Sequence, residues 1–392
     1  MTTWSVVKDD TGEKRLGWLT PRFLLRFALL ACIALVVVGL GVALTPGNPK
    51  QPGEPPFSER ARTAALTETL RLRAAGEHLG SSAPGAGQSA LARTVTLLTG
   101  QARALLSPGQ AAPVFPSAVA AQANSATQNG PGTQAAQPST GAASPPPAPL
   151  PDSPAGLAAA LAASGSQRIA DATEADGGMA RLLAAVGTAQ LLQASSLAAA
   201  TGVPVPPNAD PVPPQLSGSC PGPVVSASPA SGGVTVAQAL EAAVRTELQS
   251  VYGYQLALTR LGGEPAKAAA GQLARHEALL RGAESLSLRH CVSPPPPEAG
   301  YGLAPSFFAA PGTGLAGLET SALPVYGDLV ALSEGETRQW AISALLETAR
   351  GAAAWGAQPG PLPGLSADVE SLPPLPDPST PTPDAPAPTP GR

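Results

Sequence analysis

The chain has 392 residues, but its 47 prolines and 42 glycines exclude a large part of it from any packed core. Aromatic residues make up 4% and charged residues 13% of the chain, so the packed parts must consist mainly of alanine, leucine and valine, which favours closely spaced helices over a sheet. The net charge is −4 and no basic patch interleaved with aromatics occurs, which excludes a nucleic-acid-binding protein. We therefore expect an all-α protein.

The N-terminal region carries the pattern of a transmembrane helix. Residues 27–44, FALLACIALVVVGLGVAL, are uncharged and apolar over a length that can cross a bilayer. Basic residues, among them Lys14, Arg15, Arg22 and Arg26, precede this run, and a polar Pro/Gly segment follows it. By the positive-inside rule, we expect residues 1–26 to be cytoplasmic and everything after the single span to be extracytoplasmic, on the outer side of the cell membrane.

The alternative for this segment is a cleaved signal peptide, since Gly41, Val42 and Ala43 place small residues before a possible cut. However, the charged region before the run is long for a signal peptide, and the apolar run exceeds the usual signal core. We therefore favour the uncleaved anchor.

Residues 57–201 predict a helical region made of two hairpins. The first hairpin has a helix over 58–79, a break at GSSAPGAG, and a second helix whose apolar stripe runs from Leu91 to Leu105. Residues 107–152 are rich in Pro, Ala, Ser and Gln without periodicity, which predicts a disordered loop. The second hairpin begins with the cap Ser153 and Pro154, and its two helices, over 154–176 and 178–200, are separated at Gly177.

A Pro/Gly/Ser-rich linker over 202–233 marks a domain boundary, and residues 234–357 then predict four helices. We expect them at 235–261, at 264–288, over a stripe at 315–332 with a kink near Pro324, and from Ser333 to about 357. Ser333 followed by Glu336 predicts a capping box for the fourth helix. Residues 358–392 are Pro-rich and predict a disordered tail.

The connection between the second and third of these helices, residues 289–312, is long for simple up-down packing. In extended form it can run the whole length of a helix bundle, so that the second hairpin starts at the opposite end. A four-helix bundle with such a crossover has the ferritin-like arrangement.

Three segments of this region support the same fold by resemblance: ALEAAVRTELQSVYGYQLALTRLGG, ARHEALLRG and GDLVALSEGETRQWAISALLETARGAAAWGA. Over residues 235–357 the sequence resembles the ferritin-like domain of unknown function 4439, which occurs in envelope proteins of high-GC bacteria. The resemblance implies a fold and a location, and no activity. Because residues 57–201 repeat the plan of hairpin, long loop and hairpin, we also expect them to form a degenerate second bundle.

A carboxylate interrupts the apolar stripe of the first helix, because Glu247 stands where the rhythm between Val244 and Val251 demands a leucine. Di-iron carboxylate sites in this fold use one Glu from each of two helices and a Glu-x-x-His from each of the other two. The sequence offers four candidate metal ligands for Fe or Mn. They are Glu247, His276, Glu319 and Glu347.

The set is degenerate, because Leu273 stands three residues before His276 and Arg350 stands three residues after Glu347. The alternative is a structural network in which Glu247 pairs with Arg245, Arg275 or Arg350 and His276 is a neutral, hydrogen-bonded core residue. We favour this structural interpretation and expect no cofactor.

Cysteines occur at three positions, of which Cys32 lies in the predicted span. We expect Cys220 and Cys291 to form a disulfide, because they lie before the first and after the second helix of one hairpin and in an oxidising compartment. A zinc site from these two cysteines and His290 is the alternative, and it lacks a fourth ligand.

No complete hydrolase or nucleotide-binding motif occurs. We expect the tyrosines and tryptophans, namely Tyr252, Tyr254, Tyr301, Tyr326, Trp340 and Trp355, to fill gaps beside small residues. The sequence thus predicts a non-enzymatic interaction or structural module of the cell envelope with an envelope protein as its partner, and it predicts no oligomeric state. The alternative is a metal-binding or redox bundle.

Overall fold

The computed structural model describes residues 54–81, 85–106, 149–206, 211–216, 220, 234–365 and 371–375. Within these residues the chain contains eight α-helices, one short 3-10 helix and no strand, which confirms the all-α prediction. The described residues from Pro56 onward form one compact unit. The predicted cytoplasmic segment, the span at 27–44, residues 107–148 of the predicted loop, and most of the predicted linker and tail lie outside the described residues.

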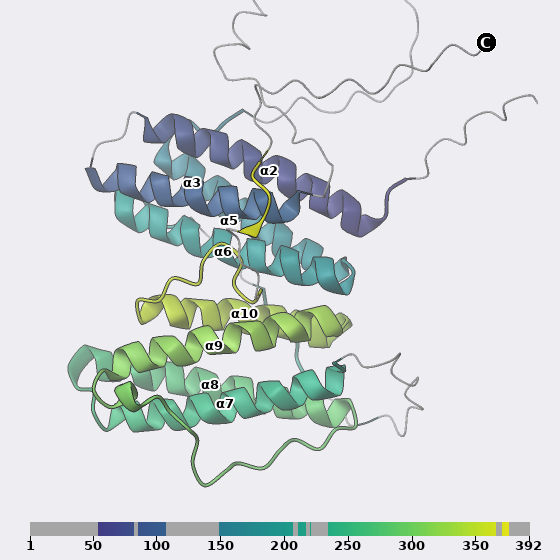
Figure 1. Ribbon diagram of the computed structural model, residues 1–392, viewed down its shortest axis with the longest axis vertical. Helices are drawn as coiled ribbons and strands as arrows, with labels where there is room; N and C mark the ends of the chain where they lie inside the picture. Colours follow the sequence, from purple (N-terminus) through teal and green to yellow (C-terminus); the bar gives the residue numbers. More distant parts are fainter. Residues whose placement is uncertain are drawn as a thin grey trace, which may run out of the picture. The chain divides into compact units, whose positions relative to one another are not determined.

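Four helices, which we call the N-terminal helix group, form two antiparallel hairpins (Figure 1). Glycines allow the second hairpin to close tightly: a Cβ at Gly165 would lie 2.9 Å from the carbonyl oxygen of Gly187. The hairpin starts as predicted, because the Ser153 side chain accepts a hydrogen bond from the backbone N–H of Gly156 at 3.1 Å. The helices are α2 (Phe57–Gly80), α3 (Gly85–Leu105), α5 (Pro154–Glu174) and α6 (Gly177–Thr201).

Among the described helices, α6 is the one that is long and apolar enough to cross a membrane. However, 67% of its most apolar window is buried inside the molecule, against α3, α5 and α9. The apolar character of α6 is therefore explained by its position as the core helix of the N-terminal helix group.

A further four helices form the C-terminal helix group: α7 (Val236–Leu258), α8 (Gly263–Arg289), α9 (Pro311–Leu332) and α10 (Gly335–Ala354). The capping box that we predicted for α10 is wrong. Ser333 instead closes α9, because its hydroxyl donates to the Leu329 carbonyl at 2.5 Å, and Glu334 occupies the N-cap without a side-chain bond. Glu336 does not bond to the N-cap, because it forms an ion pair of 2.5 Å with Arg289 at the end of α8.

The side-chain contacts fix the direction of each helix in this group. Tyr326 bonds to Glu247, and Tyr254 bonds to Glu319. The second contact lies seven residues later than the first on α7 and seven residues earlier on α9, so α7 and α9 are antiparallel. Because α7 and α8 also form an antiparallel hairpin, α8 and α9 run in the same direction. The connection 290–310 therefore crosses from one end of the group to the other.

This connection is held against α7 along its course. Glu298 forms an ion pair of 3.4 Å with Arg245, and the Gly302 carbonyl accepts a hydrogen bond from Gln249 at 2.9 Å. A 3-10 turn, η1 (Pro305–Phe307), leads into α9. Cys220 and Cys291 form a disulfide with a Cα–Cα distance of 5.0 Å, which ties the chain before α7 to the end of α8.

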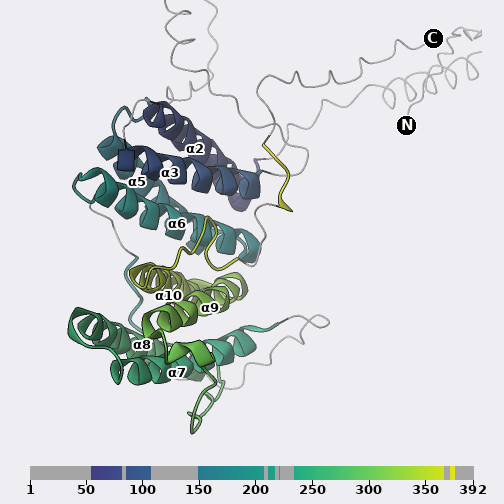
Figure 2. The ribbon, with the colours of Figure 1, turned by 60° about the vertical axis from the view of Figure 1, so that its left-hand side comes forward.

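The two helix groups meet through α6 and α9, and the segment after α10 passes between them (Figure 2). We call residues 357–365 the strap. Gln101 of α3 donates to the Pro361 carbonyl at 3.1 Å, and Leu362 is buried in the core. Arg181 of α6 donates to the Gly364 carbonyl and forms an ion pair of 2.5 Å with Asp328 of α9.

Candidate functional site

A histidine bridges two carboxylates in the core of the C-terminal helix group. His276 of α8 contacts Glu247 of α7 through Nδ1, at 2.7 Å from Oε2, and Glu319 of α9 through Nε2, at 3.0 Å from Oε1. The exposed fractions of Glu247, His276 and Glu319 are 0%, 2% and 1%. The three predicted site residues are therefore brought together out of contact with solvent.

Two tyrosines complete this arrangement. The Tyr326 hydroxyl donates to Oε1 of Glu247, and the Tyr254 hydroxyl donates to Oε1 of Glu319 at 2.5 Å. Both tyrosine side chains are fully buried. We call Glu247, Tyr254, His276, Glu319 and Tyr326 the buried centre. The two tyrosines pack in the core beside alanines, as predicted, and they are in addition hydrogen-bond donors to the two carboxylates.

The centre is reciprocal between α7 and α9. Each helix carries a Glu followed seven residues later by a Tyr, and each Tyr bonds to the Glu of the other helix. The pairs Glu247/Glu319 and Tyr254/Tyr326 are both separated by 72 residues in the sequence. This repeat is the signal in the sequence that would have identified the tyrosines.

The electrostatics of the centre favour a charged histidine. Burial lowers the pKa of His276, but the hydrogen bonds and charges of Glu247 and Glu319 outweigh it and raise the pKa to about 10. Two nitrogens facing two carboxylate oxygens require two N–H groups, which the imidazolium provides. Burial, followed by the neighbouring carboxylate charge, raises the pKa of Tyr254 and Tyr326, so both stay protonated donors.

The structural network that we predicted therefore differs in its partners. Glu247 pairs with His276 and Tyr326 rather than with an arginine, and Arg245 pairs with Glu241 and Glu298 instead. His276 carries the positive charge that we had assigned to an arginine. A short imidazole suits this position because no long side chain has to be folded into the core.

Glu347, the fourth candidate ligand, lies outside the centre. It forms ion pairs with Arg275 at 3.1 Å and Arg350 at 3.0 Å, and 34% of its side chain is exposed. The 72-residue repeat explains this position, because Glu347 is the counterpart of Arg275, and the counterpart of His276 is Thr348. At the position of α10 that corresponds to His276, a threonine thus faces the core, and it is 2% exposed.

These residues do not fit the dinuclear metal site of carboxylate proteins. The imidazole of His276 occupies the space between the two carboxylates, and both of its nitrogens are engaged by them. Across the part of the chain that the structure describes, no group of three or more His, Cys, Asp or Glu side chains is arranged to hold a metal ion. The charge that a metal would supply is provided by the imidazolium.

One family model matches the segment that contains this centre. Residues 239–367 match the Domain of unknown function (DUF4439). The match covers nearly all of α7, the whole of α8 to α10, and the strap, so it extends ten residues beyond the end that we predicted at residue 357. No curated protein and no solved structure matches the chain significantly.

Within this DUF4439 domain, Glu319 packs directly on α10. A Cβ built at Gly351 would lie 2.6 Å from Cδ of Glu319, so the carboxylate occupies space that any other residue at position 351 would need. Oε2 of Glu319 is buried without a hydrogen-bond partner among the described residues, and so is Oγ1 of Thr348, one turn before Gly351. The polar atoms of the centre therefore have fewer hydrogen-bond partners on the side of α10 than on the side of α8.

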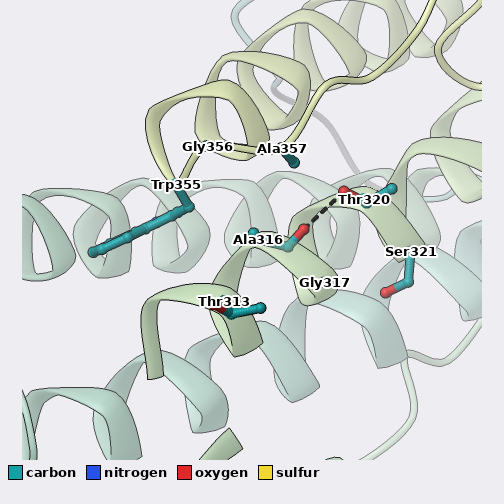
Figure 3. A pocket seen from close by; sticks show the side chains of 8 residues that line it. All are labelled: Thr313, Ala316, Gly317, Thr320, Ser321, Trp355, Gly356 and Ala357. Atoms are coloured by element: carbon teal, nitrogen blue, oxygen red, sulfur yellow. Dashed lines mark hydrogen bonds between the residues drawn. The ribbon is translucent and has the colours of Figure 1, made fainter. Parts of the chain in front are cut away.

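The DUF4439 domain connects its centre to a groove on the surface through Trp355. The indole Nε1 of Trp355 donates to the Tyr254 hydroxyl at 2.8 Å. Figure 3 shows the groove, in which Trp355 and the two residues after it face small side chains of α9, including Ala316 and Thr320. The Thr320 hydroxyl is engaged by the Ala316 carbonyl at 2.7 Å, so the groove presents few free polar groups.

Proposed function

We propose that this chain is a membrane-anchored, extracytoplasmic protein whose ferritin-like DUF4439 domain serves as a non-enzymatic interaction or structural module of the cell envelope. The observation that carries the proposal is the use of both ring nitrogens of His276 inside the protein. A centre whose histidine and tyrosines are all engaged with carboxylates stabilises the fold and offers neither a free imidazole nitrogen nor a free tyrosine hydroxyl to a substrate.

The ferritin-like assignment is supported by the direction of the helices. The antiparallel pair α7 and α9, the parallel pair α8 and α9, and the crossing connection 290–310 agree with a bundle that has one long crossover. The 72-residue repeat of the Glu and Tyr positions agrees with a bundle made of two related hairpins.

The location is supported by the sequence of the N-terminal region and by the disulfide. The apolar run at 27–44 follows a basic segment, which favours a cytoplasmic N-terminus. A disulfide between Cys220 and Cys291 is stable in the oxidising environment outside the cell. The partner that we propose is another protein of the envelope.

A metal measurement separates this proposal from the alternative, a metal-binding or redox bundle. The specific observation that favours the alternative is the convergence of Glu247, His276 and Glu319, together with the unpartnered Oε2 of Glu319. The purified full-length protein is incubated with Fe(II) or Mn(II) without oxygen, desalted, and its metal content is measured beside that of Glu247→Gln. A metal content at the background level in both the wild type and the variant supports the structural module. Stoichiometric metal that is lost in the variant supports the alternative.

A further inference from the structure

A pocket of about 570 Å³ lies where the two helix groups meet. Its walls come from α3 and α6 on one side and from the end of α10 and the strap on the other. This volume is in the range of sites that bind small molecules.

The walls of this pocket are held in place by hydrogen bonds. Gln193 of α6 donates to the Thr94 hydroxyl of α3 at 2.8 Å, which fixes two walls relative to each other. The strap is fixed by the bond of 3.1 Å from Gln101 to the Pro361 carbonyl, and the next residue, Leu362, is buried. A ligand therefore meets a preformed site and does not have to order it.

The lining combines an apolar surface with a single charge. Leu97, Ala189, Leu192 and Ala353 contribute apolar side chains, whereas Arg93 is the one charged residue among those that line the pocket. This composition fits a ligand with an apolar body and one anionic group.

The guanidinium of Arg93 is available to such a ligand. Arg71 and Arg73 in the neighbouring α2 each pair with a glutamate within one helical turn, at 2.7 Å. Arg93 has no acid at the corresponding positions of α3, and it forms no ion pair with any residue in the described ranges. An exposed arginine beside an apolar pocket is suited to a bidentate bond with a carboxylate.

We propose that this pocket binds a single-chain amphiphile with one carboxylate group, of the fatty-acid class, with the carboxylate on Arg93 and the chain along Leu97 and Leu192. The inference rests on the pocket alone and stands independently of the function proposed above. Since the ligand would contact α3, α6 and the strap, its binding also stabilises the contact between the two helix groups.

The test uses the full-length protein in nanodiscs of phosphatidylcholine, with empty nanodiscs as the background for partitioning. Calorimetric titrations compare decanoate with decanol, which has the same chain length and no charge. We expect decanoate to bind at least about tenfold more tightly than decanol, as a charge-assisted hydrogen bond provides. Arg93→Gln removes this preference, and Arg281→Gln, an exposed arginine of α8 outside the pocket, retains it.

A second variant tests the apolar part of the pocket. Ser196→Trp places a large side chain into the pocket from an exposed position of α6, and it should weaken the binding of both ligands while the melting temperature is kept. The proposal is overturned if neither ligand binds above the nanodisc background, if decanol binds as tightly as decanoate, or if Arg93→Gln binds decanoate as the wild type does.

Discussion

Glu319 of α9 and Gly351 of α10 share one volume: the Glu319 carboxylate fills the place where a side chain at position 351 would begin, with its Cδ 2.6 Å from the point that a Cβ there would occupy. Gly351→Ala should therefore destabilise the protein by about 1–3 kcal/mol through overpacking. Chemical denaturation of both proteins measures this difference.

The matched control for this prediction is Gly271→Ala in the middle of α8, where a Cβ meets no atom within 4 Å. Here the helix propensity of alanine should stabilise the protein by up to about 1 kcal/mol. If both substitutions have the same effect, the close packing of Glu319 against α10 is refuted.

His276 should be the costliest single residue to remove from the centre. His276→Leu leaves Glu247 and Glu319 as buried carboxylates without their cation, which should cost about 3–5 kcal/mol. The variant His290→Leu is the control, because His290 is exposed and bonds to a hydroxyl group, that of Thr337, at 2.9 Å. If His276→Leu lowers the free energy of unfolding no more than His290→Leu does, the ionic bridge is contradicted.

Each tyrosine of the centre should contribute through its hydroxyl. Tyr326→Phe keeps the ring and removes the donor to Glu247, so we expect a loss of about 1.5–3 kcal/mol. Tyr252→Phe is the control, since the Tyr252 ring packs against Tyr301, with 5.6 Å between the ring centroids, outside the centre. Urea denaturation of the two variants compares the losses, and equal losses would argue against a buried hydrogen bond to a charged group.

The stability of the protein should depend on pH through His276. Its pKa is raised from 6.5 to about 10 on folding, so the folded state holds the proton more tightly than the unfolded chain. The stabilisation is complete below pH 6.5 and decreases as the pH rises to about 10, with a slope of about 1.4 kcal/mol per pH unit. Denaturation of wild type and His276→Gln at several pH values measures this slope as the difference between the two proteins, and a constant difference refutes it.

The disulfide should stabilise the protein mainly by restricting the unfolded chain. It joins residues 71 positions apart, and a loop of this length contributes about 4 kcal/mol in the chain-entropy model. Replacing both Cys220 and Cys291 by serine should lower the free energy of unfolding by about 4 kcal/mol. Labelling of the unfolded, unreduced wild type should detect no thiol at these two positions, and two labelled thiols there would show that the bridge is absent.

The sequence predicted the elements of this fold well, because alanine-rich stripes, caps and glycine breaks are local signals. It also placed Glu247 and His276 in the core, since both interrupt apolar stripes with helical spacing. The tyrosines of the centre were missed for the opposite reason. Tyr254 and Tyr326 continue the apolar rhythm, so periodicity reveals their rings and not the partners of their hydroxyl groups.

Glu347 shows why a ligand set was difficult to predict. It stands next to Thr348 in the sequence, and a rotation of one residue along α10 decides whether a side chain enters the core or meets Arg275 at the surface. The capping box at Ser333 failed for a related reason, because Glu336 has a competing partner, Arg289, that is distant in the sequence. Both errors arise from tertiary contacts that local patterns do not contain.

The protonation of His276 tests the central claim most directly. Nitrogen NMR of the full-length protein, labelled with ¹⁵N in its three histidines and assigned with His276→Gln, reports the state of each ring nitrogen. We predict that both nitrogens of His276 are protonated at pH 7.5 and stay so after addition of Fe(II) or Mn(II). A neutral imidazole at pH 7.5, or the loss of a ring proton to a bound metal, would contradict the charged bridge between Glu247 and Glu319.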